Sequence, residues 1–196
     1  MVWMNKDLPL FNVLKQSYGE PKQSKKLMRE NYGYYLDKKL SNGNQQVYYK
    51  PDEKRLLVSV SGTHNLSDWG TDAYLAVGKL KDTNRYKEAD SILKKAKQKY
   101  NPTNTTVAGH SLGSTIGQGI ASKAGGDHFI GLDAGYTIGQ KTHSSNGNFQ
   151  HFRSKGDIVS LLGANAKHMK TLQNQPSQNP LRAHNVDNIK NEKIYV

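Results

Sequence analysis

The sequence Thr105-Thr106-Val107-Ala108 runs directly into Gly109-His110-Ser111-Leu112-Gly113. The first four residues are partly β-branched and predict a strand, and residues 116–123, which include several small side chains, predict a helix. A G-x-S-x-G motif between a strand and a helix is typical of an elbow that presents a serine for catalysis. The glycines allow the sharp, strained turn that lifts the hydroxyl out of the sheet. Ser111 is therefore the candidate nucleophile, and the alternative is a structural serine in a glycine-rich or anion-binding turn.

Further elements are predicted on both sides of this motif. Short apolar or alternating patterns predict strands at residues 56–60, 128–132 and 148–153. Residues 85–100 predict an amphipathic helix with Ala89, Leu93 and Ala96 on its apolar face, and the turn Asn42-Gly43 precedes another strand at residues 46–49. Alternating strands and helices form a mostly parallel sheet with helices on both faces. With the serine motif, this pattern predicts an α/β-hydrolase fold.

Two backbone amides are expected to form an oxyanion hole, which stabilises the negative charge that develops on an ester oxygen. In such a fold one donor is the amide of the residue after the nucleophile, here Leu112, and the other comes from the loop after an earlier strand. That loop reads Ser61-Gly62-Thr63-His64. Gly62 permits close approach of the backbone to a ligand, and Thr63 offers both an amide and a hydroxyl. The alternative is an ordinary turn at the end of a strand.

The acid and the base are expected after the nucleophile, in that order. Asp157 follows the strand at residues 148–153 and is preferred to Asp133, which ends the preceding strand, and to Asp127, because one more strand separates Asp157 from the elbow. Two histidines follow Asp157. His184 comes after a long loop, from which it can reach over the edge of the sheet, and on position alone it is preferred to His168.

Composition narrows the classes of partner. The chain carries 28 Lys+Arg against 16 Asp+Glu, a net charge of +12, which favours polyanions or peripheral contact with an anionic membrane. Most of the excess positive charge is lysine, which suits non-specific electrostatic attraction of anions better than hydrogen bonding to particular bases. No specific binding of nucleic acid is therefore expected. The alternative is a solvated basic surface that serves solubility. No oligomeric state is indicated.

Other features bear on organisation and location. Residues 1–32 are polar and basic, and we expect them to be helical and packed on a catalytic domain of residues 33–196. No stretch reaches the length of a transmembrane helix and no convincing signal peptide is present. We therefore expect a soluble protein, either cytoplasmic or packaged and released, for example with a virion. Cysteine is absent, which excludes disulfides and thiolate metal sites. Neither a cofactor nor a metal is expected, because a serine mechanism needs none and the histidines lack zinc-ligand spacing.

Several motifs in order resemble the class-three, or fungal-type, lipase family. They are Gly62-Thr63, then Trp69 and Asp72 in a Trp-x-x-Asp pattern, the elbow with His110 at its second position, Asp157-Ile158-Val159, and the late His184. The similarity spans about residues 33–190. It implies an α/β-hydrolase acting on lipid esters, with Thr63 as an oxyanion residue through its amide and hydroxyl, and with Asp157 and His184 as acid and base.

The sequence also departs from the family pattern. The family usually has an arginine before Gly-Thr, where this chain has Ser61, and the chain is much shorter than the secreted fungal enzymes of the family. Residues 73–84 hold few apolar side chains, so we expect a minimal lid or none. A viral or phage origin would suit the size and the charge. The sequence therefore predicts a serine carboxylic-ester hydrolase of the lipase or phospholipase type. The alternatives are a hydrolase-fold binding or structural protein, associated with a virion or a polyanion, and a non-lipid esterase, thioesterase or peptidase.

Overall fold

The strands of the described residues form one seven-stranded sheet, whose strand order follows the chain from β1 to β7. The structure is a computed structural model that describes residues 7–19, 21–63, 80–135, 148–161, 169–172 and 179–196. The first strands are antiparallel and comprise β1 (Tyr35–Leu36), β2 (Gln45–Lys50) and β3 (Arg55–Val60). From β3 onward all pairs are parallel, through β4 (Asn104–His110), β5 (His128–Leu132), β6 (Phe149–Ser154) and β7 (Lys170–Leu172). The predicted mostly parallel sheet is confirmed.

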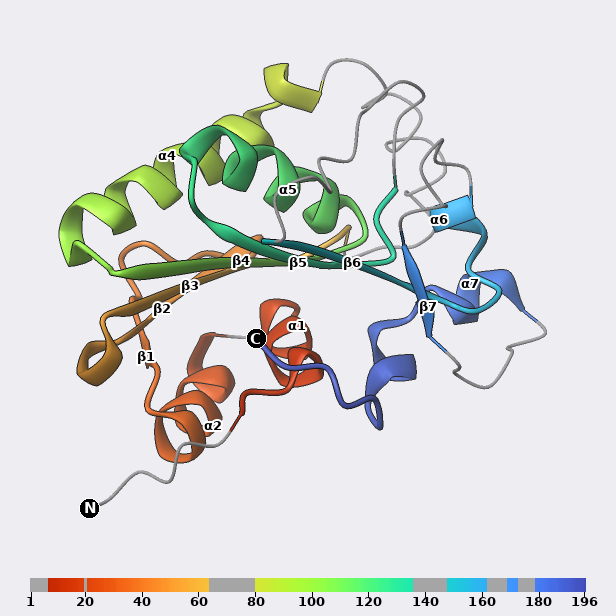
Figure 1. Cartoon of the computed structure of the whole chain (residues 1–196), viewed down its shortest axis with the longest axis horizontal. Helices are drawn as coiled ribbons and strands as arrows, with labels where there is room; N and C mark the ends of the chain where they lie inside the picture. Colours follow the sequence, from red (N-terminus) through yellow and green to blue (C-terminus); the bar gives the residue numbers. More distant parts are fainter. Residues whose placement is uncertain (1–6, 20, 64–79, 136–147, 162–168, 173–178) are drawn as a thin grey trace.

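Helices cover both faces of the sheet, as predicted (Figure 1). One face carries α4 (Asn84–Tyr100) and α5 (Leu112–Ala124), and the other carries α1 (Leu10–Ser17), α2 (Pro21–Tyr32) and the C-terminal 3₁₀ turn η4 (Val186–Ile189). The remaining short elements are η1 (Pro51–Glu53), η2 (Leu80–Asp82), α6 (Ile158–Leu161) and α7 (Pro180–Ala183). None of the described helices has both the length and the apolar character needed to cross a membrane.

Alternation along the strands divides the core into two layers. Leu57 and Ala108 face the cluster that contains α1, whereas Val58 and Val107 face the cluster that contains α4 and α5. Successive side chains of a strand point to opposite faces, so both faces are apolar only because helices cover both. This is why the central strands appear in the sequence as short, nearly continuous apolar runs.

Helices α4 and α5 pack closely on one another and on the sheet. The Thr83 side chain caps the start of α4 by accepting from the Tyr86 amide, and buried residues on α4 include Ala89 and Leu93. A Cβ at Gly117 of α5 would lie 3.1 Å from the Phe129 ring, and a Cβ at Gly119 would lie 2.8 Å from the Tyr86 ring. The small residues of α5 therefore permit the close helix–sheet packing expected from the sequence.

The N-terminal helices lie beneath the sheet. Helix α1 buries Leu10, Val13 and Leu14 in the core. The residues at its start pair with the C-terminal segment, because the Leu10 amide donates to the Ile194 carbonyl at 2.8 Å and the Val196 amide donates to the Leu8 carbonyl at 2.9 Å. The division of the chain at residue 33 stays a prediction.

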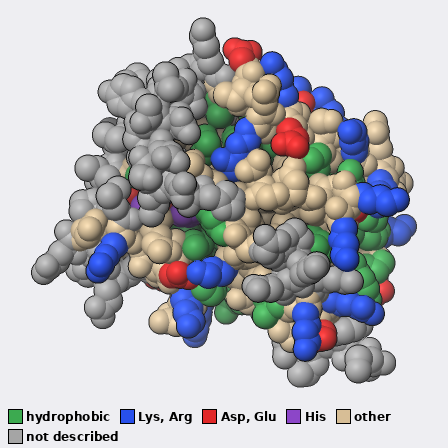
Figure 2. All heavy atoms as spheres, turned by 180° about the vertical axis from the view of Figure 1, so that it is seen from behind, with side chains coloured by type: hydrophobic (Ala, Val, Ile, Leu, Met, Phe, Trp, Pro, Cys, Tyr) green, Lys and Arg blue, Asp and Glu red, His purple; other side chains and the backbone are tan. Residues whose placement is uncertain are grey.

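Lys and Arg side chains are spread over the face seen from behind instead of gathering in one patch (Figure 2).

Candidate active site

The elbow lies at the junction of β4 and α5. Ser111 has φ 58° and ψ −130°, a region that costs a non-glycine residue about 1–3 kcal/mol and that clusters at functional sites. Its amide donates to the Leu132 carbonyl of β5 at 3.0 Å. A Cβ at Gly113 would overlap the backbone carbonyl oxygens of Val60 and Ser61, so glycine there permits close approach of α5 to the end of β3. A Cβ at Gly109 would likewise overlap the backbone of Gly113 and Ser114, so backbone contacts require both flanking glycines.

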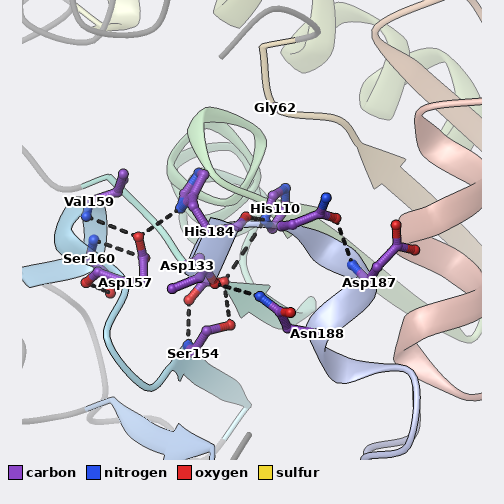
Figure 3. Close-up of polar contacts among 12 residues, drawn as sticks. Gly62, His110, Asp133, Ser154, Asp157, Val159, Ser160, His184, Asp187 and Asn188 are labelled. Carbon is purple, nitrogen blue, oxygen red and sulfur yellow. Dashed lines mark hydrogen bonds and ion pairs between the residues drawn. The ribbon is translucent and has the colours of Figure 1, made fainter. Parts of the chain in front are cut away.

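A buried carboxylate–imidazole pair lies beyond the neighbouring strand ends (Figure 3). Asp157, between β6 and α6, accepts hydrogen bonds from the amides of Val159 at 3.0 Å and Ser160 at 3.1 Å. The Nδ1 atom of His184, which follows α7, lies 3.0 Å from Asp157 Oδ1. With Nδ1–H donating to the carboxylate, Nε2 is left as the basic nitrogen of a neutral imidazole.

The charge state of Asp157 results from opposing effects. Burial by itself raises its pKa, but hydrogen bonds from His184, Ser160 and Val159 outweigh burial and hold the pKa below its ordinary value. The group is therefore an anion at neutral pH.

One cavity of about 210 Å³ joins the predicted residues, with Ser111, His184, His110 and Thr63 among those lining it. Among the described residues, no group accepts or donates a hydrogen bond at Ser111 Oγ or Thr63 Oγ1. Catalytic hydrogen bonds are often long without substrate and tighten only in the complex. Leu112 begins α5 directly after Ser111, so its amide belongs to the first turn of a helix, where amides lack partners within the helix.

His110 connects three segments of the site. Tyr18 Oη lies 2.6 Å from His110 Nδ1, and His110 Nε2 lies 3.0 Å from the His184 carbonyl oxygen. Tyr18 Oη also accepts from the Gly62 amide at 2.7 Å. The tautomer that satisfies all of these bonds has Tyr18 donating to Nδ1 and Nε2–H donating to the carbonyl. Burial, with a smaller contribution from His184, lowers the pKa of His110 to about 3, so His110 is neutral.

The rival acids occupy other surroundings. Asp133, at φ 50°, accepts from the Ser154 amide at 2.5 Å and the Ser154 hydroxyl at 2.7 Å, and lies 4.0 Å from His110. Burial, then the nearby Asp157 charge, raises the pKa of Asp133. Asp127 precedes β5 at the end of the sheet opposite the elbow, where Lys97 pairs with it at 2.6 Å. The structure thus joins His184 to Asp157, the acid preferred from the sequence.

Two groups of expectations are not tested by the described residues: several residues of the family pattern and the absence of a metal. Trp69, Asp72 and His168 lie outside the described residues, and so does most of the segment predicted to hold a minimal lid or none. His110, Asp133 and His184 have potential ligand atoms within 4.8 Å of one another, but each already has hydrogen-bond partners within the chain. That catalysis needs no metal stays a prediction.

Sequence reasoning missed two contributors to the site, Tyr18 and Arg85. Arg85, in the first turn of α4, donates from one guanidinium nitrogen to the carbonyl of Ser61 at 2.5 Å and to the carbonyl of Gly62 at 3.1 Å. One signal in the sequence was that Ser61 stands before Gly62, where the class-three lipase pattern usually has an arginine. Only the path of α4 shows that a distant arginine reaches this loop.

Comparison with known proteins agrees with the α/β-hydrolase fold. No family model matches the sequence, and no curated protein matches it. Among solved structures, the chain is similar to a lipase from Rhizopus microsporus var. chinensis, with a TM-score of 0.58 and 15% identity over 86% of this chain and 74% of that one. It is also similar to the Rhizomucor miehei lipase in its propeptide complex, with a TM-score of 0.54 and 12% identity over 88% and 73%. At these identities the likeness establishes the fold.

Proposed function

We propose that this protein is a serine hydrolase of carboxylic esters that acts on lipid esters, in the manner of a lipase or phospholipase. The observation that carries the proposal is the buried pair of Asp157 and His184, 3.0 Å apart, which shares one cavity with Ser111 on a strained elbow. Unrelated enzymes use this combination of nucleophile, base and orienting acid for acyl transfer. The similar structures from Rhizopus and Rhizomucor are lipases, which supports lipid esters as the substrate class.

The proposed reaction proceeds through an acyl-enzyme. Ser111 Oγ attacks the ester carbonyl carbon while His184 Nε2 takes the hydroxyl proton, and the carbonyl oxygen becomes an oxyanion. The amides of Leu112 and Thr63, with the Thr63 hydroxyl, donate to that oxyanion. Collapse of the tetrahedral intermediate breaks the ester C–O bond, and His184 gives its proton to the departing alkoxide. Water then attacks the acyl-serine by the same route, releasing the carboxylic acid and restoring Ser111.

The electrostatics of the site suit this cycle. Asp157 is held ionised and stabilises the positive charge that His184 acquires when it takes the proton. His110 lies beside His184, with ring centroids 5.0 Å apart, and a positive charge there would oppose protonation of His184. Burial keeps His110 neutral. The single cation that forms during the reaction is therefore the one paired with Asp157.

Labelling with a fluorophosphonate probe, which phosphonylates activated serines, tests the nucleophile. We expect the wild-type protein to be labelled and Ser111→Ala to be unlabelled. Ser114→Ala is the matched control, because Ser114 is a buried serine one turn along α5 and its loss should leave labelling intact. Labelling that persists in Ser111→Ala would contradict the assignment. A folded wild-type protein that resists the probe would favour the binding or structural alternative.

The substrate class needs a separate measurement. Nitrophenyl esters of increasing chain length, triacylglycerol emulsions and phospholipid vesicles should all be assayed beside Ser111→Ala, which corrects for background hydrolysis. We expect turnover on esters of lipid acyl chains. Hydrolysis confined to acetyl esters, thioesters or peptides would support the non-lipid alternative, with the same nucleophile.

A further inference from the structure

The loop that carries the second expected oxyanion donor is held from both sides at Gly62. On one side the Gly62 amide donates to Tyr18 Oη at 2.7 Å. On the other side the Gly62 carbonyl accepts from Arg85 at 3.1 Å, and the same guanidinium nitrogen reaches the preceding Ser61 carbonyl at 2.5 Å. Both polar groups of the glycine and the carbonyl before it are thereby fixed in direction.

The bond to the Gly62 carbonyl has a direct consequence for Thr63. The Gly62 carbonyl and the Thr63 amide belong to the same peptide unit, which is planar and trans, so the C=O and N–H point in opposite directions. No cis peptide bond occurs among the described residues. Arg85 holds the carbonyl oxygen on the α4 side, so the Thr63 N–H must point to the other side of the loop. A rotated peptide would present a carbonyl oxygen there instead, and it would repel an oxyanion.

The loop cannot obtain this restraint from a side chain of its own. A Cβ at residue 62 would lie 2.8 Å from the Ser111 Cβ and would also overlap the Tyr18 hydroxyl. Glycine is therefore required, and glycine gives its backbone the widest rotational freedom of any residue. The contacts that fix the peptide have to come from elsewhere in the fold, here from α4 and from the end of α1.

Arg85 is suited to this task. It lies in the first turn of a 17-residue helix whose start is capped by Thr83 and whose buried face begins at Tyr86, so its backbone is firmly placed. Its guanidinium offers several donors in a fixed plane. A positive charge next to a carbonyl oxygen polarises the peptide, which strengthens the N–H of the same unit as a donor.

We propose that Arg85 is a positioning residue that fixes the Gly62–Thr63 peptide so that the Thr63 amide faces the oxyanion. This inference rests on the proposed function. Arg85 is not among the residues that line the cavity, so it acts through the peptide and not on the substrate. Arg85 belongs to α4 and not to the loop itself, in which Ser61 directly precedes Gly62.

The experiment compares Arg85→Met, which keeps an aliphatic stem and removes every donor, with Arg85→Lys, which keeps a charge and one donor group. Lys87→Met is the matched control, because Lys87 is an exposed residue of the same helix. Removal of one oxyanion donor lowers kcat about 10²–10³-fold. Since Arg85→Met misplaces a donor without deleting it, we expect kcat to fall about tenfold or more with KM changed less than about twofold. Arg85→Lys should recover part of the loss.

Inhibition separates this role from general damage to the site. A trifluoromethyl ketone with the substrate's acyl chain forms a tetrahedral adduct on Ser111 and places an oxyanion where the transition state has one, whereas the carboxylic acid product does not. We expect Arg85→Met to weaken ketone inhibition by the same factor as kcat, with inhibition by the product unchanged.

Two results would overturn the inference. One is a folded Arg85→Met protein with wild-type kcat and wild-type ketone affinity. The other is equal weakening of ketone and product, which indicates a disturbed pocket. If Arg85→Met does not fold, the test uses Arg85→Lys. The inference requires the kcat of Arg85→Lys and its affinity for the ketone to fall together, and it is overturned if they do not. Failure of the proposed function would be seen separately, as a wild-type protein that the fluorophosphonate does not label.

Discussion

Replacing Asp157 by Asn is the sharpest test of the site, because the structure shows that an amide cannot meet every demand made on the carboxylate. Asp157 Oδ1 serves both His184 Nδ1 and the Val159 amide, and Oδ2 serves the Ser160 amide. If Asn presents its oxygen at the Oδ1 position, its NH₂ group opposes the Ser160 amide. If it presents its NH₂ there, it opposes the Val159 amide and forces His184 to carry its proton on Nε2, where it cannot accept from Ser111.

The expected magnitudes follow from this conflict. An unmatched buried amide costs about 1–3 kcal/mol of unfolding free energy, so the variant should remain folded but with a lower urea midpoint. The wrong tautomer lowers turnover about 10⁴-fold, equivalent to about 5.4 kcal/mol of transition-state stabilisation. Turnover on a nitrophenyl ester and urea unfolding, measured on the same preparation, give both quantities.

Asp133→Asn is the matched control. Asp133 is equally buried, directly follows the adjacent strand β5 and accepts from Ser154, so its replacement should lower stability while turnover falls far less than in Asp157→Asn. The reasoning is refuted if Asp157→Asn keeps more than about a tenth of wild-type turnover, against the loss of about four orders of magnitude expected for a triad acid. It is refuted equally if Asp133→Asn, while folded, is the more damaging change, since the acid would then lie after β5.

Three further predictions concern stability and binding. Because burial lowers the pKa of His110 to about 3, the unfolded chain takes up its proton first on acidification. As the pH falls from about 6.5 toward 3, the free energy of unfolding should therefore decrease by up to about 1.4 kcal/mol per pH unit. Urea unfolding across that range should show a shallower decrease for His110→Gln than for the wild-type protein. Equal pH dependence of the two unfolding free energies would contradict the prediction. Gly113→Ala should cost about 1–3 kcal/mol by overlap with backbone carbonyls, whereas Gly43→Ala, with no atom within 4 Å of the added Cβ, should cost little in the same thermal melts. Vesicles of anionic lipid should bind the protein and raise its ester turnover, and both effects should weaken as the salt concentration approaches ~0.5 M. If the vesicles do neither at low salt, the membrane hypothesis is wrong and the basic surface serves solubility.

Much of the architecture was readable from the sequence because its signals are local. A β-branched run, a G-x-S-x-G motif and a helix with small residues follow one another closely, so β4, the elbow and α5 could be predicted as one unit. The amphipathic pattern of α4 places its start within one residue of the observed Asn84. The weak signals lay in short or polar elements. Strand β7 has only three residues, too few to show a period, and α2 is largely polar.

The sequence by itself determined the central strands β2 to β6, helices α4 and α5, the sharp turn at Ser111 and the short list of acids and histidines that follow it. It did not distinguish Asp133 from Asp157 physically, since each is an aspartate just beyond the end of a predicted strand. The tertiary structure made that distinction by bringing His184 to Asp157 and Ser154 to Asp133. It also brought Tyr18 and Arg85 to Gly62, across 44 and 23 positions of the chain. Such contacts leave no local pattern, because a side chain that holds a distant backbone group is selected by the packing of whole elements and not by its neighbours in sequence.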